Sequence, residues 1–268
     1  MAIKFFPRSD RESKSEENTS SGLGTFGGVF TPSILTILGV IMYLRFGWGV
    51  GNVGLIGTFA IVSLSTGITF LTGLSIASIA TDQRVRTGGA YYMISRSLGI
   101  EAGGAVGIPL YIAQALSVAL YTIGFAESVV NVFPVLDQKM VALVTTSAVT
   151  LLAMRSAAAA IKIQYVIMGA IGLSLVSLIF GSPVEAVPVA QEAATNKAGF
   201  WVVFAVFFPA VTGIMAGVNM SGDLKDPGRS IPIGTMAAIV VGYLIYMGIP
   251  FILSSRATPE QLISDPLI

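Results

Sequence analysis

The sequence predicts an all-α membrane protein with about seven transmembrane helices. Of its 268 residues, 54% are hydrophobic and only 11% are charged, whereas an ordinary soluble domain has roughly 25% charged residues. The charged residues also gather in short segments that separate long uncharged runs. Because the hydrocarbon core of a bilayer is about 30 Å thick, about 20 residues of helix cross it. Each uncharged run is therefore a candidate span.

The uncharged runs predict the spans in chain order. They are residues 18–44, 46–81, 102–126, 140–154, 163–184, 198–222 and 230–255. The first run inserts after its polar start, and the short fourth run can extend through residues 157–160. The first 17 residues hold four basic and four acidic side chains and too few apolar ones to offset the entropy of ordering. We therefore expect a disordered tail over 1–20, a transmembrane domain over 21–255 and a second tail over 256–268.

The basic residues between the spans predict the orientation. Eleven of the fifteen Lys and Arg residues lie on the side of the N-terminus. The four on the other side are Arg45, Lys139, Lys197 and Arg256. Because cytoplasmic loops carry the excess of Lys and Arg, we expect a multi-pass integral membrane protein. Its N-terminus is then cytoplasmic and its tail over 256–268 extracellular.

The composition also excludes several classes of function. The chain contains no His and no Cys, so it lacks a Ser-His-Asp or Cys-His nucleophile, a His or Cys metal site and any disulfide. A net charge of +1 provides no basic field for nucleic acid. We predict a protein that is not an enzyme, has no cofactor and binds no nucleic acid, and whose partners are lipid and small solutes.

Two predicted spans carry residues that do not suit an uninterrupted helix. They are the segments Pro32–Ile41 in the first span and Phe208–Gly217 in the sixth. Each has a Pro, a Thr three or four residues later, and a Gly followed by two bulky apolar residues. Corresponding Gly and Pro interruptions in two halves of a chain indicate the binding site of a transporter built from inverted repeats.

A helix that breaks at membrane depth suits a pair of ions. The half-helix that ends there offers carbonyl groups and its negative dipole end to a cation, and the half-helix that starts there offers N–H groups to an anion. The groups on the carbonyl side, predicted to bind a cation, are Thr36, Ile37, Pro209 and Thr212. The groups on the N–H side, predicted to bind an anion, are Gly39, Val40, Ile41, Gly213, Ile214 and Met215. The alternative is close packing, because Gly213 and Gly217 form a G-x-x-x-G pattern that commonly marks a helix contact.

Two polar residues of the third span leave alternatives open. Tyr121 lies midway along the span, where its hydroxyl needs a partner, and it is either a packed residue bonded to a carbonyl or a ligand. Glu127 is the acid nearest to the membrane core and is a functional candidate by default. Its place near the outer end of the span favours a solvated or helix-pairing role.

Three separated motifs resemble the cation-chloride cotransporter family, of the amino acid-polyamine-cation superfamily. They are Gly39–Arg45, Thr87–Gly99, and Phe207–Gly217 with the following Ser221–Leu224, in register over residues 23 to 250. The resemblance implies two inverted five-helix repeats with broken helices 1 and 6. The first repeat is then at about 21–184, and the second starts at about 198–255.

The resemblance also implies a function and a set of ligands. The family carries out electroneutral symport of chloride with potassium, sodium or both. The backbone amides of Gly39–Ile41 and Gly213–Met215 would bind chloride. The groups implied for potassium are Thr36, Ile37, Tyr121, Pro209 and Thr212. The family usually has Asn in place of Thr36, whose hydroxyl can still bind a cation.

Two other functions remain open at this point. One is an amino acid permease of the same superfamily, whose substrate carboxylate would take the N–H groups of the first break. The other is a non-transporting subunit or fragment. Since a five-plus-five fold closes its site with both repeats, we expect the chain to be the N-terminal part of a longer transporter. Otherwise a second copy or another chain would complement it.

Overall fold

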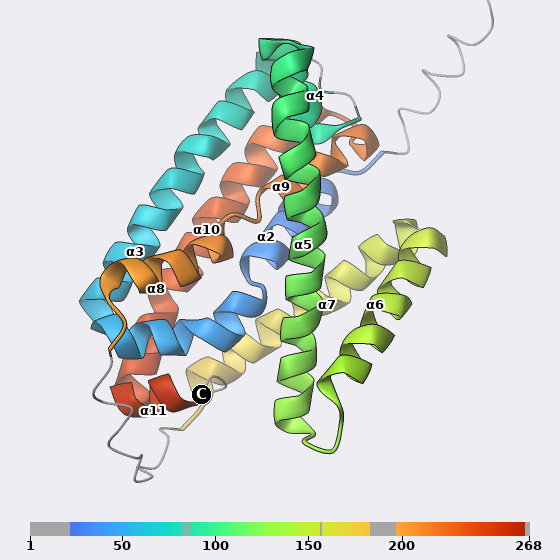
Figure 1. Ribbon diagram of the computed structural model, residues 1–268. Helices are drawn as coiled ribbons and strands as arrows, with labels where there is room; N and C mark the ends of the chain where they lie inside the picture. The colour runs from blue at the N-terminus through green and yellow to red at the C-terminus, as the bar shows by residue number, and fades with distance from the viewer. Residues whose placement is uncertain (1–21, 83–84, 86, 156, 183–196, 266–268) are drawn as a thin grey trace, which may run out of the picture.

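Helices account for almost all of the described chain, which in this computed structural model comprises residues 22–82, 85, 87–155, 157–182 and 197–265 (Figure 1). The predicted tail over 1–20 lies outside these residues. The helices of the part up to residue 182 are η2 (Phe26–Phe30), α2 (Thr31–Ile37), α3 (Val40–Asp82), α4 (Gly89–Leu98), α5 (Ile100–Val132), α6 (Gln138–Arg155) and α7 (Ala157–Phe180). Those after it are α8 (Phe200–Phe207), η4 (Phe208–Val211), α9 (Met215–Asn219), η5 (Met220–Asp223), α10 (Pro227–Arg256) and α11 (Pro259–Ser264).

Five helical segments of the described chain are long and apolar enough to cross a membrane. They are Phe26–Asp82, Ile100–Val132, Ile161–Phe180, Phe200–Asp223 and Pro227–Arg256. The first covers the two predicted runs 18–44 and 46–81 in one segment of 57 residues. Helix α6 covers the predicted fourth run, 140–154, but it is not among the five. The described residues thus contain several candidate membrane spans, as predicted, while the number seven stays a prediction.

The boundary between the first two predicted spans is wrong by nine residues. Because a charge normally ends a span, the sequence predicts the boundary at Arg45, but helix α3 continues through Arg45 and bends at Gly54. Gly54 has φ 71° and ψ 178°, a conformation that glycine adopts without steric cost. The long Arg45 side chain stays on the helix surface, where its guanidinium reaches Glu127.

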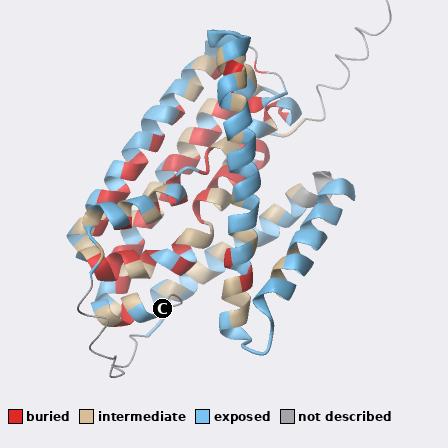
Figure 2. Cartoon of the chain, in the orientation of Figure 1, coloured by how far each residue is buried: buried red, intermediate tan, exposed pale blue. Residues whose placement is uncertain are grey.

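The core lies where the first, second, sixth and seventh predicted spans meet (Figure 2). Its centre is an aromatic cluster of Phe46, Phe207 and Tyr246, whose ring centroids are 5.3 to 5.4 Å apart. Each such aromatic pair contributes about 0.5–1.5 kcal/mol beyond the area that it buries. The cluster therefore ties α3, α8 and α10 together beside the two breaks.

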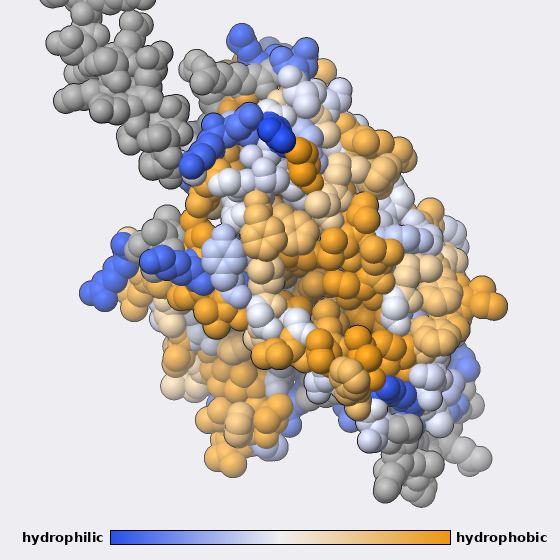
Figure 3. Space-filling view, turned by 180° about the vertical axis from the view of Figure 1, so that it is seen from behind, coloured by the Kyte–Doolittle hydropathy of each residue, from blue (hydrophilic) through white to orange (hydrophobic). Residues whose placement is uncertain are grey.

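Helices α5, α6 and α7 contribute little to this core. Helix α6 buries no residue, and α5 buries only Gly103, Gly124 and Ala126. In Figure 2 these helices are mostly exposed. Seen from behind, apolar side chains cover most of the middle of the molecule, and hydrophilic groups lie at its upper end, its left edge and its lower right (Figure 3).

Two short helices outside the predicted spans hold the ends of the bundle. Helix α4 contains most of the Thr87–Gly99 motif and approaches α9 so closely that a Cβ on Gly89 would lie 2.5 Å from Asn219 Oδ1. Helix α11 lies within the predicted tail 256–268 and begins with a capping box of Thr258 and Gln261. Its Leu262 is only 1% exposed and packs against α3 near Gly51.

Candidate functional site

Both helix interruptions lie where the Pro and Gly pattern predicts them. Helix α2 ends at Ile37, Leu38 leaves the helical conformation with φ −81° and ψ 40°, and α3 starts at Val40. In the sixth predicted span a 3-10 turn ends at Val211, and α9 starts at Met215. The Pro of each segment occupies one of the first two positions of its turn, where no intrahelical N–H is needed.

The two interruptions are packed against each other. A Cβ on Gly213 would lie 2.7 Å from Thr36 Cβ and 2.9 Å from the Ile37 amide nitrogen. One turn later, a Cβ on Gly217 would lie 2.5 Å from both Ser33 Oγ and the Val29 carbonyl oxygen. Ser33 Oγ donates a hydrogen bond of 3.3 Å to the Ile214 carbonyl. The packing interpretation of the G-x-x-x-G pattern is therefore confirmed, and the same packing brings the two breaks together.

The residues predicted to bind an anion occupy the starts of the new helical turns. In the first break Met42 N bonds back to Gly39 O at 3.1 Å, and in the second Ala216 N bonds back to Gly213 O at 3.2 Å. The preceding amides, those of Gly39–Ile41 and Gly213–Met215, hold the positions at which a helix start leaves N–H groups without intrahelical partners. Gly213 and Ile214 are buried, and the other four are half-buried.

The oxygen atoms predicted to bind a cation mostly have partners within the protein. Thr36 Oγ1 donates to the Pro32 carbonyl at 2.8 Å, and Thr212 Oγ1 donates to the Pro209 carbonyl at 2.8 Å. The Ile37 carbonyl accepts a hydrogen bond from the Tyr246 hydroxyl. A cation at this point would therefore share or displace these bonds.

Tyr121 lies beside the first break, as the resemblance implies. Its Cε1 is 3.6 Å from the position of a Cβ on Gly39, and its side chain is half-buried. One turn further along α5, a Cβ on Gly124 would lie 2.2 Å from Val40 Cγ2, so a glycine there lets α5 approach the break. Pro209 and Thr212 are exposed, and the Thr212 hydroxyl donates its hydrogen bond to the Pro209 carbonyl.

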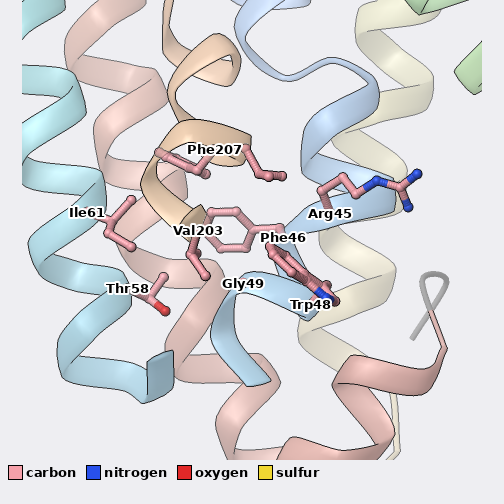
Figure 4. A pocket seen from close by; sticks show the side chains of 9 residues that line it. Arg45, Phe46, Trp48, Gly49, Thr58, Ile61, Val203 and Phe207 are labelled. Carbon is pink, nitrogen blue, oxygen red and sulfur yellow. The ribbon is translucent and has the colours of Figure 1, made fainter. Parts of the chain in front are cut away.

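An ion pair connects the first and third predicted spans beyond the break. Arg45 Nη2 lies 3.5 Å from Glu127 Oε1, so the helix-pairing role of Glu127 is confirmed. Arg45 also borders a small pocket lined by Phe46, Trp48, Val203 and Phe207, from which its guanidinium points away (Figure 4). The pocket lining is almost wholly apolar, so this pocket does not suit an ion.

Sequence reasoning missed two residues that organise the breaks, Ser33 and Tyr246. Tyr246 is completely buried, and its hydroxyl binds a carbonyl 209 residues away in sequence. A hydroxyl in the middle of an uncharged run needs a partner. The need for a partner that singles out Tyr121 in the sequence therefore singles out Tyr246 as well.

Comparisons with known proteins agree with this architecture. A family model described as amino acid permease matches residues 28–260. Human solute carrier family 12 member 1 is 37% identical, over 90% of this chain and 24% of that protein. Mouse solute carrier family 12 member 2 is 36% identical, over 86% and 21%. Member 3 from Pseudopleuronectes americanus is 38% identical, over 83% and 25%. The chain thus spans about a quarter of the length of these relatives.

Proposed function

The chain belongs to the amino acid permease family and is a homologue of the cation-chloride cotransporters of solute carrier family 12, and on this premise we propose that it carries the ion site of a secondary active transporter. The family consists of transporters and not of enzymes. The proposed reaction is electroneutral symport of chloride with potassium, sodium or both. Its architecture has about seven spans, with helices 1 and 6 of an inverted-repeat fold broken at the site.

The observation that carries the proposal is the direct contact between the breaks. Thr36 and Ile37 of the first break lie against Gly213 of the second, so the end of one half-helix lies beside the start of another. Each ion then lies near a helix end of opposite sign. A cation and chloride bound side by side also neutralise each other, which lowers the cost of holding charge at membrane depth.

Residue roles follow from this arrangement. Chloride binds the amides of Gly39–Ile41 and Gly213–Met215. The cation binds oxygen atoms of Thr36, Ile37, Tyr121, Pro209 and Thr212. The packed glycines hold the two backbones close enough for one site to draw on both breaks.

The test is ion flux in proteoliposomes. We would measure uptake of labelled chloride with potassium, sodium or choline outside, for this chain and for a hybrid in which residues 28–260 replace the matching part of human solute carrier family 12 member 1. Gly172→Ala in both proteins is the matched control, because a Cβ on Gly172 meets no atom within 4 Å. Saturable chloride uptake by the hybrid that requires potassium or sodium supports the proposal. Chloride uptake that choline sustains equally well contradicts it.

The alternative is an amino acid permease, which the name of the matching family favours. A substrate carboxylate would then replace chloride at the amides of the first break. Labelled amino acids in the same liposomes distinguish the two functions. Amino acid uptake without chloride dependence would establish the alternative.

The proposed orientation has its own test. With a cytoplasmic N-terminus, single Cys residues at Lys139 and Lys197 react with an impermeant thiol reagent from outside, and those at Lys162 and Arg229 do not. Because the chain has no native Cys, background labelling is absent. Labelling of Arg229→Cys from outside would reverse the orientation.

A further inference from the structure

Tyr246 lies in the core with its hydroxyl on the first break. Its exposure is 0%, and its ring is held between Phe46 and Phe207, with centroids 5.4 and 5.3 Å away. Close packing of this kind allows the ring no alternative position. The hydroxyl therefore stays beside the Ile37 carbonyl, to which it donates a hydrogen bond.

The Ile37 carbonyl is at the end of helix α2, where carbonyl groups lack intrahelical partners. The residue is buried, with 3% exposure, so an unpaired carbonyl there would be costly. The bond from Tyr246 satisfies this carbonyl without a cation. We propose that Tyr246 is a positioning residue that competes with the transported cation for the Ile37 carbonyl, an inference that rests on the proposed function.

A second observation supplies the place to which the Tyr246 hydroxyl turns. A small cavity behind the break is lined by Ile37, Thr66, Thr69 and Tyr246, among others. Thr66 Oγ1 is buried there without a hydrogen-bond partner among the described residues. A phenol O–H rotates without moving its ring, so when a cation takes the carbonyl the hydroxyl turns toward Thr66. The cavity is just large enough for one water. That water would bridge the Tyr246 hydroxyl and Thr66 Oγ1.

The competition has a consequence for binding that simple damage to the fold does not have. In Tyr246→Phe the cation-free protein keeps a buried carbonyl without a partner, whereas the cation-bound protein loses only a bond made through water, and that water still serves Thr66. Cation binding then becomes tighter by about fivefold, the effect of one net hydrogen bond. Release becomes slower in the same proportion, so the apparent KM for potassium and the maximal rate of uptake both fall.

The Thr66→Val variant has the opposite expectation. Valine keeps the shape of threonine but removes the group to which the Tyr246 hydroxyl turns in the cation-bound state. Potassium binding weakens, again by about fivefold. The matched control is Tyr243→Phe, one turn before Tyr246, whose hydroxyl lies 3.2 Å from Ser63 Oγ on the same helix pair.

The test observes the Ile37 carbonyl directly by NMR. Isoleucine labelled with 13C at the carbonyl and leucine labelled with 15N mark three Ile–Leu pairs in this chain, at residues 34–35, 37–38 and 252–253. We would titrate potassium, then sodium, into the chain in lipid nanodiscs. The Ile37 signal is expected to move with potassium in the unsubstituted protein, at about fivefold lower concentration in Tyr246→Phe and at the unchanged concentration in Tyr243→Phe.

The outcomes separate the inference from the proposed function. If the Ile37 signal does not respond to either cation in the unsubstituted protein, the proposed cation site is wrong and the competition is wrong with it. If it responds, but Tyr246→Phe has an unchanged or weaker affinity, the site stands and the competition alone is overturned. If Tyr246→Phe does not fold, Thr66→Val decides alone, because unchanged or tighter potassium binding there contradicts the proposal.

Discussion

Two groups of helices are similarly apolar but differ in burial. The packed group comprises the broken helices and α10, within residues 26–82, 200–223 and 227–256. The exposed group comprises α5 to α7. Of the most apolar 18 residues of Phe26–Asp82, Phe200–Asp223 and Pro227–Arg256, 33%, 44% and 39% are buried. The same measure is 0% for Ile100–Val132 and Ile161–Phe180. Apolar character therefore explains why each helix enters a membrane, but it does not explain which helices pack together.

For α7, small residues at the contacts account for part of the difference. In the packed group a Cβ on Gly213, Gly217 or Gly234 would lie within 2.7 Å of another helix. On α7, a Cβ on Gly169 or Gly172 would meet nothing within 4 Å. Because lipid tails are as apolar as leucine, helices associate in a membrane through close packing rather than through the removal of apolar surface from water.

The largest expected effect comes from an isoleucine in each region. Ile61 on α3 is 1% exposed and Ile112 on α5 is 52% exposed. Ile61→Ala should lower the free energy of unfolding by about 2–4 kcal/mol, because it leaves a cavity that the packed group cannot close. Ile112→Ala should change it by less than about 1 kcal/mol, since lipid can fill the space. Unfolding by SDS in mixed micelles measures both, and equal losses would refute the contrast.

A glycine pair gives the next effect. Gly213→Ala places a methyl group against Thr36 and should destabilise the protein by about 1–3 kcal/mol through overpacking. Gly172→Ala meets open space and should be neutral or slightly stabilising, because alanine favours a helix. The same SDS titration applies. A neutral Gly213→Ala would mean that the breaks do not pack as described.

Tyr121 tests whether the exposed group takes part in the site. In the hybrid transporter, Tyr121→Phe should raise the potassium concentration for half-maximal chloride uptake by about 5- to 30-fold. This is the effect of losing a polar contact of about 1–2 kcal/mol. The control is Tyr111→Phe, at a position on the same helix that is 76% exposed, which should leave the potassium dependence unchanged. An unchanged dependence for Tyr121→Phe would leave Tyr121 with a packing role only.

The smallest effect is expected for the ion pair between the regions. The side chains of Arg45 and Glu127 are 45% and 31% exposed, so water and salt screen their attraction. A double-mutant cycle with Arg45→Gln and Glu127→Gln should give a coupling below about 1 kcal/mol. Added salt should reduce it further. A larger, salt-insensitive coupling would show that α5 is bound to the packed group more firmly than its burial indicates.

The sequence by itself determined the features that depend on local chemistry. The apolar runs predicted the helices, and Pro32 with Gly39 and Pro209 with Gly213 predicted the two interruptions. Each of these follows from a residue and its close neighbours in the chain, because Pro removes an N–H and Gly releases the backbone. The family was recognisable for the same reason, since its motifs are short and contiguous.

Only the tertiary structure decided which of these features meet. Ser33 and Ile214 are 181 residues apart, and Tyr246 and Ile37 are 209 residues apart, so no local pattern pairs them. Helix α3 also continues through Arg45 to Gly54, and Glu127, the partner of Arg45, is 82 residues away in sequence. Hydrogen bonds and packing join groups by distance in space, and helices of equal apolar character can be arranged in many ways until side chains at their contacts select one.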